Sequence, residues 1–192
     1  IEIATDPGGA PVAMLPSRPG LAALLPALSI THACGRVIAL GLPASDPGVR
    51  VGVDLTGVEA RPDSFAEQWL TDSEQLLLAA LPTEPQRATR LAELWSLKES
   101  VSKALGLGLQ LTTGELEITQ LHDDGTADIQ LHGMAAQRYH DLGGKRIQAT
   151  VEPWTDGVLA WACLDLGDEP ETTETASTPL KGMREARLRP QL

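Results

Sequence analysis

Short runs of alternating apolar and polar residues, separated by glycine and proline, fill the first part of the chain. A period of two is typical of half-buried β-strands, and the intervening turn residues predict hairpins. A proline-rich segment over residues 42–48 predicts a surface loop before the last of these strands. The predicted strands cover Ile1–Ala4, Pro11–Leu15, Leu28–Thr31, Arg36–Leu40 and Val49–Leu55.

From Ser64 the apolar positions recur every three to four residues, which predicts helices. A capping box at Thr71 starts a second short helix, and prolines end it. A long helix over about residues 86–105 follows, and two glycines close it. Alternation then returns, and the predicted strands cover Glu115–Thr119, Ala127–Leu131, Lys145–Val151 and Val158–Leu164. Because strands and helices are segregated along the chain, the order predicts an α+β fold.

The charge balance restricts the partners of the chain. Its 15 lysines and arginines against 26 acidic residues give a formal net charge of −11. Such a surface repels nucleic acid and anionic membranes, so we expect neither as a partner. No apolar run approaches the roughly 20 residues of a membrane span, and we expect a cytoplasmic protein. Local cationic groups are therefore informative.

Lysine is absent before Lys98, and a second lysine follows at Lys103. On the predicted long helix, Trp95, Glu99 and Lys103 fall on one stripe, with Lys98 beside it. One interpretation is a solvated Glu99–Lys103 surface pair, which stabilises a helix by roughly 0.2–0.5 kcal/mol. The other is a site for a phosphorylated ligand and a metal, because Trp95 should point toward the core and hold the stripe close to the protein body.

Two strand ends carry further candidate groups. Asp54 ends an apolar strand, so it is either a turn former or a metal ligand. A second carboxylate from the helix would suit Mg²⁺, which takes one or two carboxylates together with phosphate and water. Thr31 and His32 also end a strand, where they are either structural or hydrogen-bond donors to a phosphate.

The order of these elements resembles the 4′-phosphopantetheinyl transferases of the surfactin-activating type. The family pattern of a Ser-His strand, a Gly-Ile/Val-Asp strand and a Trp-Ser-x-Lys-Glu-x-x-x-Lys helix stands here as Thr31-His32, Gly52-Val53-Asp54 and residues 95–103. The resemblance implies Mg²⁺-dependent transfer of 4′-phosphopantetheine from coenzyme A to a serine of an acyl or peptidyl carrier protein, either in trans or on the same polypeptide.

The resemblance also implies roles for single residues. Asp54 and Glu99 would hold Mg²⁺, and Glu99 would help to deprotonate the incoming serine. Lys103 would neutralise phosphate, with Lys98 as a second ligand-binding lysine. Thr31 and His32 would contact the nucleotide end of coenzyme A. The catalytic set is therefore expected to be Asp54, Glu99 and Lys103.

The same resemblance implies a pseudo-dimer of two similar α+β halves, with the site in the cleft between them. Residues 1–53 would be a shortened N-terminal half, and residues 54–166 the C-terminal half with the metal and phosphate site. Residues 167–192 read as a linker-like tail because they are rich in threonine, glutamate and proline and then basic. This tail and the missing initial methionine favour a domain of a larger polyketide or fatty-acid synthase.

Two positions depart from the family pattern. Thr56 stands where many members have a second carboxylate, and Ala10 stands in place of a lysine expected at the nucleotide phosphate. These departures favour a rival hypothesis, in which the chain is a weak or inactive transferase-like module with a structural or interaction role in a megasynthase. A third hypothesis is a Mg²⁺-dependent phosphoester hydrolase, which would release phosphate from coenzyme A without a carrier protein.

Overall fold

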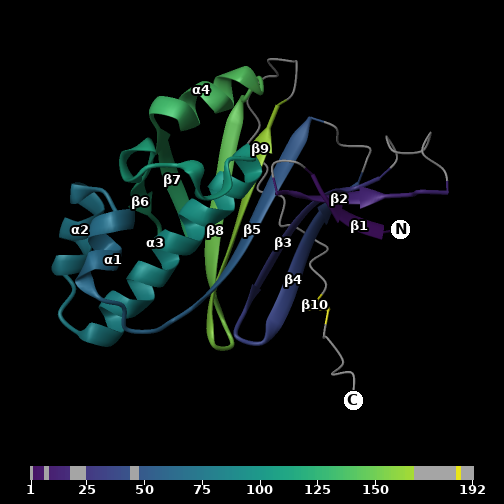
Figure 1. Ribbon diagram of the computed structural model, residues 1–192. Helices are drawn as coiled ribbons and strands as arrows, with labels where there is room; N and C mark the ends of the chain where they lie inside the picture. The colour runs from purple at the N-terminus through teal and green to yellow at the C-terminus, as the bar shows by residue number, and fades with distance from the viewer. Residues whose placement is uncertain (1, 7–8, 18–24, 44–47, 167–184, 187–192) are drawn as a thin grey trace.

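The computed structural model describes residues 2–6, 9–17, 25–43, 48–166 and 185–186. Its centre is a five-stranded antiparallel sheet with the order β5-β9-β8-β7-β6, and the long helix α3 crosses one face of it (Figure 1). The strands of this sheet are β5 (Val49–Gly57), β6 (Leu116–Leu121), β7 (Thr126–Leu131), β8 (Arg146–Trp154) and β9 (Gly157–Asp165). The helices are α1 (Asp63–Trp69), α2 (Asp72–Ala79), α3 (Glu84–Leu105) and α4 (Gly133–Asp141).

Helix α3 forms because its ends are capped and one face is apolar. Thr83 accepts a hydrogen bond from the Gln86 N–H, and Gly106 ends the helix with a φ of 74°, a conformation that favours glycine. The predicted start of this helix lay after Pro85, but Pro85 belongs to its first turn, where the missing N–H costs nothing. Buried leucines and alanines of α3 form one core with β6, β8 and β9.

A close backbone contact holds α3 against β5. Gly52 lies opposite the helix, and a Cβ there would overlap the carbonyl oxygen of Ser100 and lie 2.7 Å from the backbone nitrogen of Ala104. Only glycine permits this approach. As a result, Asp54, two residues further along β5, lies next to the last two turns of α3.

The hairpin of β3 (Ala27–Ala33) and β4 (Arg36–Leu42) lies along the edge of β5 that does not face β9 (Figure 1). The contact uses side chains in place of a backbone ladder. The Ser29 hydroxyl accepts a hydrogen bond of 3.0 Å from the Val53 N–H, and the Thr31 hydroxyl accepts one of 3.1 Å from the Leu55 N–H. Two strand hydroxyls thus satisfy an edge that would otherwise expose its donors.

The remaining described elements are peripheral. Strands β1 (Glu2–Thr5) and β2 (Pro11–Met14) form a separate hairpin, and the short strand β10 (Glu185–Ala186) pairs with β4. The 3₁₀ turns η2 (Gly108–Gln110) and η3 (Thr113–Glu115) follow α3. Among the described residues, no helix is both long enough and apolar enough to cross a membrane.

The α+β prediction is confirmed, and each strand predicted within the described residues is present with shifted ends. Helix α4 was not predicted, because Gly133, Gly143 and Gly144 at its borders resemble the turns of a loop. The boundary expected after residue 53 falls inside β5. The pseudo-dimer and the shortened first half stay predictions. The tail predicted over 167–192 lies outside the described residues, apart from β10.

Candidate active site

An open cleft of about 560 Å³ lies between β3, β5 and α3. Its polar lining comes from all three elements, so residues far apart in the sequence meet there. Alternation along each strand and the helical repeat of α3 aim these side chains at one space. The polar side chains that line the cleft include Thr31, His32, Asp54, Thr56, Glu99 and Lys103.

Asp54 is the most heavily bonded group of the cleft. Its Oδ1 accepts a hydrogen bond of 2.7 Å from Lys103 Nζ and one of 3.2 Å from the Thr31 hydroxyl. Its Oδ2 accepts bonds of 2.8 Å from the Thr56 hydroxyl and 3.0 Å from the Ser96 hydroxyl. The side chain is buried, so this cage of three hydroxyls and one ammonium offsets the cost of removing the carboxylate from water.

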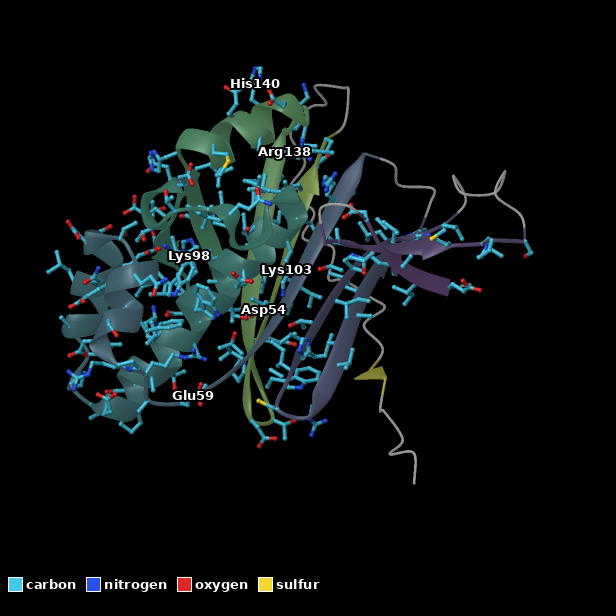
Figure 2. All side chains as sticks on the ribbon, in the orientation of Figure 1. Asp54, Glu59, Lys98, Lys103, Arg138 and His140 are labelled. Carbon is cyan, nitrogen blue, oxygen red and sulfur yellow. The ribbon has the colours of Figure 1, made fainter. Side chains whose placement is uncertain are left out.

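Lys103 points across the cleft and not along its own helix. Its Nζ donates to Asp54 Oδ1 and, at 3.1 Å, to the Val53 carbonyl oxygen of β5. The solvated Glu99–Lys103 surface pair is therefore wrong, because Lys103 contacts another element and is only 26% exposed. Figure 2 shows Lys103 beside Asp54, at the border between α3 and β5.

Glu99 is the one acidic side chain of this group that makes no hydrogen bond or ion pair to the residues that the structure describes. Desolvation and the negative charge of Asp54 raise the pKa of Glu99, and the charge of Lys103 opposes this rise. Glu99 lines the cleft, a second hollow of about 260 Å³ toward Gly106, and a narrow one of about 30 Å³ beside Trp69 that has room only for water. Its carboxylate therefore lies where the cleft and the hollow toward Gly106 adjoin.

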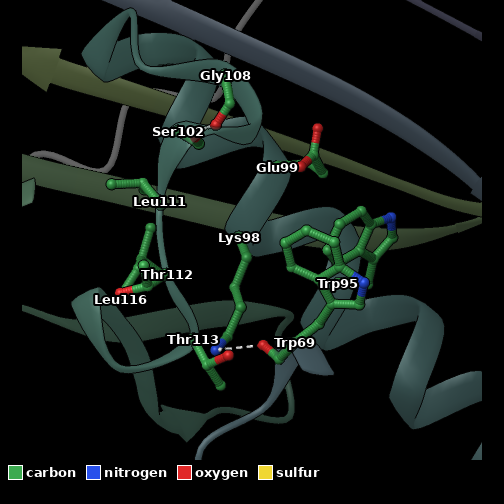
Figure 3. Close-up of a pocket in the computed structure, with 10 residues that line it drawn as sticks. All are labelled: Trp69, Trp95, Lys98, Glu99, Ser102, Gly108, Leu111, Thr112, Thr113 and Leu116. Carbon is green, nitrogen blue, oxygen red and sulfur yellow. Dashed lines mark hydrogen bonds between the residues drawn. The ribbon is translucent and has the colours of Figure 1, made fainter. Parts of the chain in front are cut away.

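Lys98 does not line the cleft. Its Nζ forms an ion pair of 2.6 Å with Glu74 of α2 and donates a bond of 3.0 Å to the Trp69 carbonyl oxygen. Burial lowers the pKa of Lys98, while the charge of Glu74 opposes this effect. Figure 3 shows Lys98 extending toward Trp69, whereas Glu99 points away from it. The Nζ of Lys98 is therefore held by α2 and by Trp69, away from Asp54 and Lys103, although Lys98 and Glu99 both line the small hollow beside Trp69. Its predicted role as a ligand-binding lysine stays a prediction.

Thr31 and His32 both line the cleft, but they differ in what they offer a ligand. Thr31 is buried, and its hydroxyl already contacts Asp54 and the backbone of β5. His32 is exposed. The predicted core orientation of Trp95 is met in part, because its ring packs 4.8 Å from that of Trp69 and 5.2 Å from that of Phe65 while it also lines the cleft.

Ser96 is a site residue that the sequence reasoning missed. It is fully buried, and its hydroxyl contacts both the side chain and the backbone carbonyl of Asp54. A signal was available, because Ser96, Glu99 and Lys103 follow an i, i+3, i+7 spacing that places them on one helix face. What the spacing could not show was the partner, since Asp54 is 42 residues away.

Two carboxylates of the cleft fit a magnesium ion better than a metal that needs a complete protein cage. Within the described residues, no group of three histidine, cysteine, aspartate or glutamate side chains could hold a metal. Mg²⁺ is satisfied by one or two carboxylates with phosphate and water. Glu99 has a free carboxylate that is repelled by Asp54, and a divalent cation would relieve this repulsion.

Comparison with known proteins places this architecture in a family. A family-wide profile described as the 4′-phosphopantetheinyl transferase superfamily matches residues 50–152, which include β5, α3 and most of the main sheet. The chain is 38% identical over 93 residues to a holo-acyl-carrier-protein synthase of Limosilactobacillus reuteri, covering 44% of this chain and 77% of that protein.

Two further similarities are to a small part of a large enzyme subunit and to a solved structure. The chain is 31% identical over 114 residues to the fatty acid synthase subunit alpha of Schizosaccharomyces pombe, covering 57% of this chain but 6% of that one. Among solved structures, the complex of the Chronobacterium ammoniagenes synthase with coenzyme A matches with a TM-score of 0.51 and 23% identity, over 62% of this chain and 98% of that one. The structural likeness shows the shared fold.

Proposed function

This chain belongs to the 4′-phosphopantetheinyl transferase superfamily, and from that premise we propose that it transfers 4′-phosphopantetheine from coenzyme A to a serine hydroxyl of an acyl carrier protein, with Mg²⁺. The observation that carries the proposal is the meeting of Asp54, Glu99 and Lys103 in one cleft from two elements. The names of the relatives support the two substrates, since these are synthases of holo-acyl-carrier protein and one was solved with coenzyme A.

The transfer is a displacement at phosphorus. The serine oxygen forms a bond to the pantetheine-bearing phosphorus of the pyrophosphate, the bond from that phosphorus to the bridging oxygen breaks, and 3′,5′-ADP leaves with the bonding pair. Mg²⁺ bound by Asp54 and Glu99 would neutralise charge on the phosphate oxygens. Lys103 would supply a second positive charge to the same oxygens.

Glu99 would take the proton that serine loses. Its pKa is raised by burial and by Asp54, so it holds a proton more strongly than an ordinary exposed glutamate. Its position between the cleft and the hollow toward Gly106 would give both substrates access to one carboxylate. Asp54, held in its cage of hydroxyls, would keep its orientation through the reaction.

The test supplies an apo acyl carrier protein in trans and measures its loading from labelled coenzyme A with Mg²⁺. We expect loading by the unmodified chain and loss of more than about 100-fold for Asp54→Ala and Glu99→Ala, the scale of removing a preorganised charge contact. Glu93→Ala is the matched control, because Glu93 lies on α3, is partly buried and pairs with Arg90 outside the cleft. Activity of either cleft variant within tenfold of the unmodified chain would contradict the assignment.

A second candidate is an inactive transferase-like module. Two observations favour it: the Thr56 hydroxyl is occupied by Asp54 and adds no charge, and Ala10 is neutral where the family pattern has lysine. This reading predicts no loading of any carrier by the unmodified chain, although the fold would be intact. The same assay therefore separates the two candidates, provided that circular dichroism confirms a folded protein.

A further inference from the structure

Two hydroxyls of β3 bind β5 in the same way, but only one of them also contacts Asp54. Ser29 and Thr31 are two residues apart on the strand, so they share one of its faces. Both are buried, at 4% and 5% exposed, and they accept hydrogen bonds of 3.0 Å from the Val53 N–H and 3.1 Å from the Leu55 N–H. The Thr31 hydroxyl lies 3.2 Å from Asp54 Oδ1 in addition, whereas Ser29 has no bond to Asp54 in the part of the chain that the structure describes.

The direction of the Thr31 hydroxyl is fixed by these two partners. A hydroxyl has one proton to donate and two lone pairs that accept, and the Leu55 N–H occupies one of the lone pairs. The carboxylate of Asp54, which pairs with Lys103 at 2.7 Å, can only accept, so the Thr31 proton points to Oδ1. One side chain therefore joins the docking of the β3–β4 hairpin on β5 to the orientation of Asp54.

The hairpin holds Thr31 in place from its other strand as well. Thr31 lies opposite Ile38 of β4, and Ile38 is 3% exposed in a core that it shares with Val53 and Leu55. Figure 1 shows the hairpin alongside β5. Turning the Thr31 hydroxyl toward a ligand in the cleft would break both of its bonds and leave the Leu55 N–H unpaired in a buried place, which is costly. The hydroxyl is therefore better placed to hold Asp54 than to bind a ligand.

We propose that Thr31 is a positioning residue for Asp54 and not a ligand of coenzyme A: its hydroxyl holds the carboxylate in the orientation in which Asp54 would bind Mg²⁺. The role of the metal rests on the proposed function. The family resemblance gives Thr31 a different task, which is a contact with the nucleotide end of coenzyme A. The two assignments can be separated, because metal binding depends on the Asp54 carboxylate and a nucleotide contact does not.

Three variants of the full chain test the assignment. Thr31→Val keeps the shape of the side chain and removes the hydroxyl, whereas Thr31→Ser keeps the hydroxyl. Ser29→Ala is the matched control, because it removes an equally buried hydroxyl and its bond to β5 but leaves the contacts of Asp54 unchanged. Circular dichroism and thermal melts show whether each variant is folded. If Thr31→Val does not fold, Thr31→Ala replaces it, because it removes the same hydroxyl without placing a methyl group against the carboxylate.

The first measurement is a calorimetric titration by Mg²⁺ with coenzyme A present, corrected for the binding of Mg²⁺ to coenzyme A alone. We expect Thr31→Val to raise the Kd for Mg²⁺ by at least about tenfold, the scale of a hydrogen bond to a charged group. Thr31→Ser and Ser29→Ala should stay within about threefold, because both keep a hydroxyl on Asp54 Oδ1. The second measurement is a titration by 3′,5′-ADP, which has the nucleotide end but no pyrophosphate. Thr31→Val should bind it as tightly as the unmodified chain.

Three results would overturn the proposal: an unchanged Kd for Mg²⁺ in the folded variant without the Thr31 hydroxyl, an equal loss of Mg²⁺ affinity in Ser29→Ala, or weaker binding of 3′,5′-ADP by Thr31→Val. Carrier loading measured in parallel keeps the two proposals distinct. Loading by the unmodified chain together with any of these results overturns the positioning role and leaves the transferase function standing. Absence of loading together with weaker Mg²⁺ binding in Thr31→Val overturns the transferase function alone. Absence of both loading and Mg²⁺ binding in the unmodified chain overturns both.

Discussion

Gly52→Ala tests whether the close approach of β5 and α3 creates the site. The added Cβ would overlap the Ser100 carbonyl oxygen and lie 2.7 Å from the Ala104 nitrogen, and both are backbone atoms that cannot rotate away. Overpacking of this kind typically costs about 1–3 kcal/mol. The loss of chain entropy in the unfolded state recovers only about 0.4–1 kcal/mol. We therefore expect a net loss of about 1–2 kcal/mol, or about 2–8 °C in Tm for a chain of this size.

The functional consequence should exceed the loss of stability. Moving α3 away from β5 lengthens the 2.7 Å contact between Lys103 and Asp54, and it separates Glu99 from Asp54 in the same step. Thermal melts and carrier loading below the lowered Tm measure the two effects. Gly114→Ala is the control, because a Cβ there meets nothing within 4 Å and the φ of Gly114 is not in the left-handed region. Wild-type stability and activity in Gly52→Ala would refute the reasoning.

Two further predictions concern the lysines. Lys103→Ala should slow loading by about 100-fold. Lys103→Arg should recover only part of the rate, because a planar guanidinium does not replace a compact ammonium. Wild-type rates for Lys103→Ala would mean that the contact with Asp54 is only structural. Lys98→Met should cost about 3–5 kcal/mol of stability, since it leaves Glu74 charged and buried, and adding Glu74→Gln should restore most of it. Coenzyme A affinity should stay within about twofold in that folded double variant, and a larger loss would return Lys98 to the ligand site.

Helix and strand periods predicted the directions of the candidate side chains, and the resemblance to the family joined them into one expected site. Glu99 and Lys103 are four residues apart, so they share a face, whereas Lys98 is rotated by about 100° from Glu99. This rotation takes the Lys98 Nζ away from Asp54 and toward Glu74. Its destination was not predictable, because its partner Glu74 belongs to a capping box that normally lies at the surface. Only the packing of α2 and β6 on α3 buries that carboxylate, which also accepts the Ile118 N–H.

The contacts that complete the site could not be predicted from the sequence either, because they join residues that are far apart in the chain. Alternation predicts that β3 and β5 are strands, but not that the Ser29 and Thr31 hydroxyls replace a backbone ladder between them. Helix α4, which brings Arg138 to the end of α3, was also missed, because glycines at both ends mask its short run of apolar positions. Such long-range contacts are set by the tertiary arrangement and leave no periodic signal along the chain.

If this acidic chain binds coenzyme A as proposed, it needs its cations held apart from its acidic surface. The structure meets this need by placing them at internal partners: Lys103 contacts Asp54, and Arg50 and Arg138 cap the end of α3. These contacts orient the charges, and Lys103 lines both the cleft and the hollow that adjoins it. A polyanion is repelled by most of a surface whose formal net charge is −11, yet it meets a fixed cation, Lys103, in the cleft. In such a chain, selectivity for phosphate comes from where the few cations lie, not from how many there are.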